Sequence, residues 1–234
     1  MTTRRVQASI VFSITLCFLI LTSLGAAQAR IVRPRSTYTG ADYGSGGQGT
    51  EIVLEAGMVM PFNDLKDDFW TTEKGLSATT GYELGARLRQ YLGYGWAISP
   101  SFHYVNFGNA TGVGDFPQGD DLAYVIDTSL FRYGVELHIF AGAPGAPIRP
   151  FLIGGAAFIH YRYRDSLQYN GIYQTSFNAP GFTAGLGFKM KSFEISGTYH
   201  FCQFDTDKLP PFSGQQETYL WNHAIVRVGL AFGN

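Results

Sequence analysis

The sequence predicts an all-β fold, an eight-stranded antiparallel up-and-down transmembrane β-barrel. Apolar and polar residues alternate with a period of two, the period of a strand, in eight segments along the chain. Each segment has about ten residues, enough for a tilted strand to cross a bilayer, and strands can do so only in a closed sheet. Charged residues make up 15% of the chain, against roughly 25% in soluble domains.

The first four segments are the clearest. They cover residues 52–60, 82–89, 96–104 and 131–139. In the first, the even positions are apolar and Glu55 stands among the odd ones. In the second, Tyr82 and Leu84 alternate with Glu83 and Arg87. Each of these segments therefore predicts a strand with one apolar and one polar face.

The last four segments follow the same pattern. They cover residues 151–162, 182–190, 193–201 and 224–232. In the fifth segment we assign Ile153, Ile159 and Tyr161 to the apolar face, and His160 and Arg162 to the polar face. The eighth segment is apolar except for one arginine near its middle, at position 227.

We predict that the polar face points into the barrel, because a charged face turned toward lipid would be costly. A soluble barrel would show the reverse arrangement and would carry more charge. The predicted inward polar network consists of Glu55, Glu83, Arg87, Arg89, Arg132, Glu136, Arg162, Lys189, Glu194 and Arg227. Isolated buried charges are expensive, so these residues should pair. We expect Arg227 to pair with at least one of the four inward glutamates, at positions 55, 83, 136 and 194. Glu55 is favoured, because the last strand must close against the first.

The N-terminal region predicts export. Arg4 and Arg5 precede an apolar stretch at 10–24, and Ala27 and Ala29 supply the small residues of a cleavage site. We therefore divide the chain into a signal peptide (1–29), a flexible periplasmic leader (30–50) and an outer-membrane β-barrel (51–232). An uncleaved N-terminal anchor is the alternative, but the stretch is shorter than the ~20 residues that span a bilayer.

The connections alternate in length. Long connections are expected at 61–79, 107–122, 164–180 and 205–218, short ones at 93–95 and 191–192, and one of moderate length at 141–150. Bacterial barrels have long outer loops and short periplasmic turns, which predicts a Gram-negative outer membrane with both chain ends in the periplasm. The long connections are acidic and contain aromatic residues, so they could bind a partner.

Together these features resemble the small outer-membrane barrels of the OmpA and OmpX type. The resemblance covers residues 51–232 and rests on the repeated pattern, on the "GYELGARLRQYL" segment and on a last strand that closes on Phe232. The chain departs from the family because Gly233 and Asn234 follow that aromatic residue. Pro100 is a second irregularity, since it lacks an N–H donor, and it predicts a bulge or a lost pairing.

Three classes of function fit these features. We expect an integral outer-membrane protein with a structural or adhesion-like surface role and a plugged polar interior, because eight strands enclose only enough room for side chains. Its partners would be outer-membrane lipid and a surface ligand or host cell contacted through the long loops, and we expect a monomer. The alternative is a narrow, porin-like gated pore, since six bases against four acids would favour anions. A lipid-modifying enzyme is the third class.

We expect no enzyme, no catalytic residue and no cofactor. Lipid A deacylases of this architecture place a His-x-Ser pair on the outer face, whereas we assign every histidine of this chain to the inner face. The histidines are His103, His138, His160, His200 and His223. Two of them, His200 and His223, could meet across the last two strands, but two histidines make a weak metal site and none is predicted. A net charge of -1 without a basic patch excludes nucleic acid as a partner.

Overall fold

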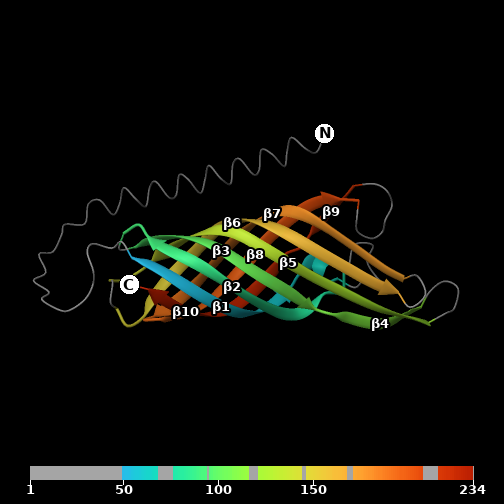
Figure 1. The fold of residues 1–234 in the computed structure, drawn as a ribbon, viewed down its shortest axis with the longest axis horizontal. Coiled ribbons are helices and arrows are strands. Elements are labelled where there is room, and N and C mark those ends of the chain that lie inside the picture. The colour runs from blue at the N-terminus through green and yellow to red at the C-terminus, as the bar shows by residue number, and fades with distance from the viewer. Residues whose placement is uncertain are drawn as a thin grey trace, which may run out of the picture. The chain divides into compact units, whose positions relative to one another are not determined.

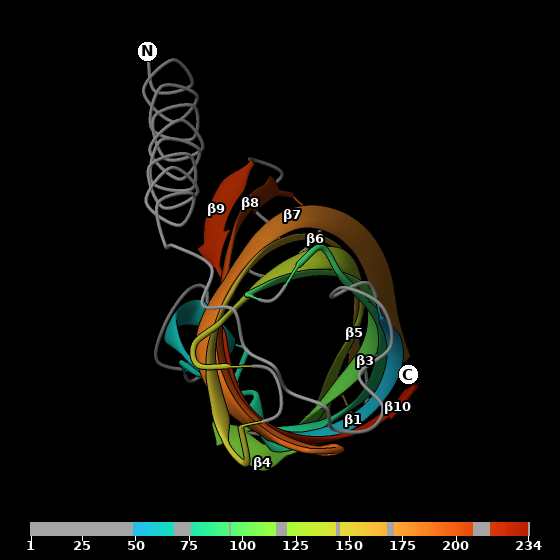
Figure 2. The same ribbon diagram turned by 90° about the vertical axis from the view of Figure 1, so that its left-hand side faces the viewer.

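The computed structural model is a closed antiparallel barrel of eight strands, as predicted. It describes residues 49–67, 76–93, 95–115, 121–143, 146–167, 171–207 and 216–233. The barrel strands are β1 (Thr50–Pro61), β2 (Thr79–Tyr91), β3 (Trp96–Gly108), β5 (Asp121–Phe140), β6 (Arg149–Leu167), β7 (Gly171–Met190), β8 (Phe193–Thr206) and β10 (His223–Gly233). The ring closes because β1 pairs with both β2 and β10, as the end-on view shows (Figure 2).

Three short elements extend the barrel at the loop end. Strand β4 (Ala110–Asp115) pairs with β5, and β9 (Glu217–Leu220) pairs with β8. A 3-10 turn, η2 (Asn63–Leu65), follows β1. In Figure 1, β4 and β9 lie at one end of the barrel, and the C-terminus lies at the other. Among the described residues, none forms a helix with the length and hydropathy to span a membrane.

The predicted two-residue period appears in the burial of the side chains. In β10, Val226, Val228 and Leu230 are 45%, 44% and 51% exposed, whereas the intervening Arg227 is 1% exposed. The same alternation runs around the barrel and leaves apolar side chains on its outer surface. The most exposed of them include Ile52, Leu54, Leu84, Leu88, Leu152, Phe158, Leu186, Leu230 and Phe232.

The assignment of faces in the fifth segment was wrong. In β6, Ile159 and Tyr161 are buried inside the barrel, while Arg162 is exposed on the outer surface and His160 is half-buried there. Both faces of this strand carry apolar residues, because Phe158 lies outside and Ile159 lies inside. The alternation was therefore ambiguous, and the two polar residues suggested the wrong side.

The predicted loop at 164–180 is also corrected, because most of it is strand. Strand β6 continues to Leu167 and β7 begins at Gly171, with continuous pairing between them. The predicted loop at 107–122 likewise contains β4 and the start of β5. The prediction limited each strand to the length that crosses a bilayer, but a paired hairpin can continue beyond that limit.

The predicted irregularity at Pro100 is present as a gap in pairing. The ladder between β2 and β3 pairs Arg87 with Ser101 and then Gln90 with Ile98, so the proline falls between two paired positions. On its other side Pro100 stands opposite Val135 of β5. The predicted signal peptide (1–29) lies outside the described residues, as does the leader except for residues 49 and 50.

The interior has three layers along the barrel axis. Toward the loop end lies an apolar cluster that includes Phe107, Tyr161 and Trp221. Near the short turns lies a smaller apolar cluster that includes Phe140 and Phe151. Most of the charged residues lie between these two clusters, whereas Arg89 and Arg149 lie beside the smaller one, 5.3 Å and 4.8 Å from the centroid of the Phe140 ring.

Candidate functional site

The charged layer is a single connected network of ion pairs. It joins five cations, Arg87, Arg89, Arg132, Lys189 and Arg227, to five carboxylates, Glu51, Glu55, Glu83, Glu136 and Glu194. The contributing strands are β1, β2, β5, β7, β8 and β10. Nine of the ten sequence-predicted residues therefore lie in this layer, and Arg162 does not.

Glu194 of β8 holds the two arginines of β2. The Arg87 guanidinium lies 2.5 Å from the Glu194 carboxylate, and Arg89 donates to both of its oxygens, one at 2.7 Å. Arg87 also contacts Glu55 and Glu136 at 3.2 Å each. Two arginines therefore share one carboxylate across the bore, an arrangement of strong, charge-assisted hydrogen bonds.

Arg227 connects three carboxylates. Its guanidinium lies 3.4 Å from Glu55, 3.5 Å from Glu83 and 3.5 Å from Glu136, and Nη2 donates to Thr198 at 2.8 Å. The predicted contact with Glu55 is confirmed. Glu83 of β2 and Glu136 of β5, two of the other carboxylates considered as partners, contact the same guanidinium across the bore.

Glu51 was missed by the prediction. It lies four residues before Glu55 on the same face of β1, and it accepts from Arg89 at 3.0 Å and from Lys189 at 2.5 Å. The alternation indicates it, because Glu51 lies on the polar side that also holds Glu55. With Glu51 inside and Arg162 outside, the network contains equal numbers of cations and carboxylates. The ion pairs of the network are thus balanced, and Arg149 is a further buried cation, 4.8 Å from the centroid of the Phe140 ring.

Glycine makes room for the network at Gly85. A Cβ at this position would lie 2.1 Å from Cδ2 of His103. That histidine is buried and its Nε2 contacts Glu55 at 3.0 Å, so its ring is held in place. The missing side chain at position 85 is thus a requirement of close packing inside the bore.

Four of the five histidines lie inside the barrel. His103 contacts Glu55, and His138 contacts Glu136 at 3.2 Å. His200 and His223 stand opposite each other on β8 and β10, with ring centroids 4.7 Å apart and an interplanar angle of 14°. The predicted encounter of these two is confirmed. The fifth, His160, lies on the outer surface, which corrects the assignment of all histidines to the interior.

The His200–His223 pair does not have the geometry of a metal site. The two rings are stacked, and nitrogen lone pairs lie in the ring planes, so they do not converge on one point. His200 is instead held by Thr183 at 2.8 Å and Thr198 at 3.0 Å. Within the described ranges, no cluster of three or more metal-ligating side chains occurs.

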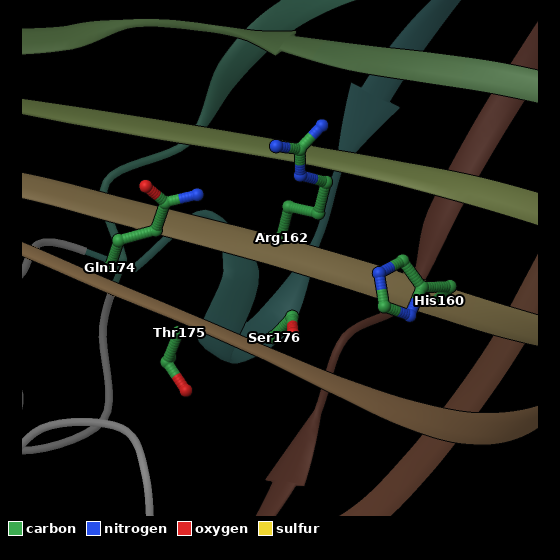
Figure 3. Close-up of a pocket in the computed structure, with 5 residues that line it drawn as sticks. All are labelled: His160, Arg162, Gln174, Thr175 and Ser176. Carbon is green, nitrogen blue, oxygen red and sulfur yellow. The ribbon is translucent and has the colours of Figure 1, made fainter.

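The outer surface carries a second polar feature, an open hollow on the β6–β7 hairpin. It is lined by His160, Arg162, Gln174, Thr175 and Ser176. Arg162 and Gln174 extend to the same side of the two strands, and Thr175 extends to the other (Figure 3). His160 contacts Asn178 on the paired strand at 2.8 Å through Nδ1.

Fold and interior define the class of this protein as a closed eight-stranded β-barrel with an apolar outer face and a filled, ionic core. No family model matches the chain, and no curated protein matches it.

Solved structures of small outer-membrane barrels resemble the chain at low identity. Ail of Yersinia pestis, in complex with the heparin analogue sucrose octasulfate, is 14% identical over 80% of this chain and 99% of that chain, with a TM-score of 0.47. The N-terminal barrel domain of Pseudomonas aeruginosa OprF is 12% identical over 80% and 99%, with a TM-score of 0.43. Neisserial surface protein A is 11% identical over 78% and 95%, with a TM-score of 0.44.

Proposed function

We propose that the chain is an integral outer-membrane β-barrel with a filled, non-conducting interior that presents its long hairpins at the cell surface. The observation that supports this most is the apolar outer surface. Leu54, Leu84, Leu152 and Leu230 are each more than half exposed, and they stand on strands around the ring. A soluble protein rarely exposes an apolar surface of this extent, whereas lipid would cover it.

Aromatic side chains at the edge of the apolar surface nearest the loop end support the same proposal. Tyr104 of β3 lies between Tyr82 of β2 at 6.4 Å and Phe131 of β5 at 5.1 Å, measured between ring centroids. On the other side of the barrel, Tyr199 and Phe201 of β8 are 4.6 Å apart. Such rings favour the interface between the hydrocarbon and the headgroups of a bilayer.

The interior favours a plug over the alternative of a gated pore. The charges of the ionic layer pair with one another, and the larger apolar cluster fills the bore on the side of the loop end. An ion that crossed would have to separate buried pairs and pass side chains such as Trp221 and Tyr161, which have no exposed surface. A lipid-modifying enzyme remains the third class. Its test would be a lipid hydrolysis assay that compares the wild-type protein with a variant at the outward His160.

Single-channel recording in planar bilayers tests the plug. We expect refolded protein, inserted as judged by resistance of the barrel to protease, to give no steady conductance. An Arg227→Ala variant is the matched comparison, because it removes the side chain that connects three carboxylates. Steady, ion-selective openings of the wild-type protein would contradict the proposal and support the pore.

The surface role needs a separate measurement. We expect non-adherent Gram-negative cells that display the chain to bind host-cell or matrix-coated surfaces, and to lose this binding when the β6–β7 hairpin is shortened beyond Tyr163 and Gln174. Folding of the shortened barrel is checked by its protease resistance. Unchanged adhesion with the shortened hairpin would remove this hairpin from the proposed role.

A further inference from the structure

The polar hollow on the outer face of β6 and β7 is part of a larger cationic patch. We define the β6–β7 polar patch as His160, Arg162, Arg164, Gln174, Ser176 and Asn178. The pairing brings these residues together, because Arg162 stands opposite Ser176 and Arg164 opposite Gln174. Both arginines are exposed.

The two arginines have unused hydrogen-bond donors. In the part of the chain that the structure describes, neither Arg162 nor Arg164 has a carboxylate within the 4.0 Å of an ion pair. On the neighbouring strand β5, Ser129 stands opposite Arg162 and Asp127 opposite Arg164. Asp127 is the one acidic residue that faces the patch from β5 among the described side chains, so the patch keeps a positive excess.

The β6–β7 polar patch borders the apolar surface on the side of the loop end. Phe158 is 53% exposed, and the next outward residues of β6 are His160, Arg162 and Arg164. A strand rises about 3.3 Å per residue and tilts by roughly 40° in a barrel, which places Arg162 roughly 10 Å above Phe158 along the membrane normal. This is the level of the headgroups if the exposed phenylalanine marks the edge of the hydrocarbon.

We propose that the β6–β7 polar patch binds the phosphate group of a membrane lipid headgroup in the leaflet at the loop end. This inference rests on the proposed membrane location. Arginine presents a planar fork of donors that matches phosphate oxygens, and Ser176 and Gln174 add neutral donors beside it. The site would anchor one sector of the barrel to the headgroup layer and fix the height of the β6–β7 hairpin.

Native mass spectrometry of the full barrel in mixed micelles of phosphatidylcholine and a minor fraction of phosphatidic acid tests the proposal. We expect the wild-type protein to retain phosphatidic acid in preference to phosphatidylcholine. In an Arg162→Gln/Arg164→Gln variant this preference should fall roughly tenfold, as expected for the loss of one charge-assisted hydrogen bond. Lys191→Gln is the control, because Lys191 is exposed at the opposite end of β7. It should retain the preference.

The remaining outcomes separate the possible sources of the phosphate. Equal retention by the double variant and the wild type would overturn the site. Displacement of the lipid by inorganic phosphate, but not by chloride at the same ionic strength, would overturn the headgroup assignment in favour of free phosphate. Protease resistance of each variant in vesicles is measured in parallel, so a failure of membrane insertion is distinguished from a failure of lipid binding.

Discussion

Arg162 and Arg227 have the same appearance in the sequence but opposite environments in the structure. Each stands in an alternating segment, and each was assigned to the inner face. Arg227 is 1% exposed and connects three carboxylates, whereas Arg162 is exposed on the outer surface. The difference shows that alternation identifies the two faces of a strand but does not by itself tell which of them is inside.

Strand β6 also differs from its neighbours on the inside. Its inward residues include Ile153, Ile159 and Tyr161, all of them buried. Its inner face meets the two apolar clusters. A strand that is apolar on both faces gives a weak alternation signal, and this is where the prediction failed.

The largest difference should come from replacing each arginine by methionine. Arg227→Met leaves three buried carboxylates without this partner, and the loss of one member of a buried pair typically costs about 3 to 5 kcal/mol. Arg162→Met should change the free energy of unfolding by about 0.5 kcal/mol or less, as expected for an exposed position. Urea unfolding in lipid vesicles measures both values. Equal losses would show that the two environments do not differ energetically.

A smaller loss of stability is expected when a charge is placed on the outer face of the barrel, halfway along its axis. Val226→Arg puts a cation beside Arg227 in sequence but on the lipid side, at a cost of about 2 to 4 kcal/mol. Serine at position 129, outward and level with Arg162, is the control: Ser129→Arg should insert normally. Insertion is followed by the gel-mobility shift of the folded barrel. Normal insertion of the valine variant would place the lipid-facing surface elsewhere.

Two glycines test the packing of the filled interior against the open outer surface. Gly85→Ala would force a Cβ against the ring of His103 and should cost about 1 to 3 kcal/mol as overpacking. Gly154→Ala meets no atom within 4 Å and should not lower stability. Urea unfolding of the pair gives the comparison. A neutral effect at Gly85 would mean that the bore is looser than the structure describes.

The smallest expected effect is the coupling energy between Arg227 and Glu55. Adding Glu55→Gln to Arg227→Met should recover part of the loss, with a coupling energy of roughly 0.5 to 3 kcal/mol. Recovery is incomplete because Glu55 also holds Arg87 at 3.2 Å and His103 at 3.0 Å. A double-mutant cycle in urea gives this value. Additive losses would show that Arg227 relies on Glu83 and Glu136 instead.

The sequence by itself determined the number of strands, their order and most of their faces. A two-residue period follows directly from strand geometry, so Arg227, Glu55 and Glu83 could be assigned to one face from spacing, and to the interior because a charged face toward lipid is costly. The closing contact between Arg227 and Glu55 could be predicted too, because an antiparallel barrel must join its first and last strands.

Only the tertiary structure decided which charges meet and where the strands end. Arg87, Arg89 and Glu194 come together across the bore, since closure of the barrel brings β2 and β8 close, and no local pattern records that distance. Arg162 lies outside because the buried residues of β6 are Ile159 and Tyr161, on the face opposite to it. Spacing along a chain fixes the side of a strand on which a residue lies, whereas the cost of a charge there depends on its surroundings in three dimensions.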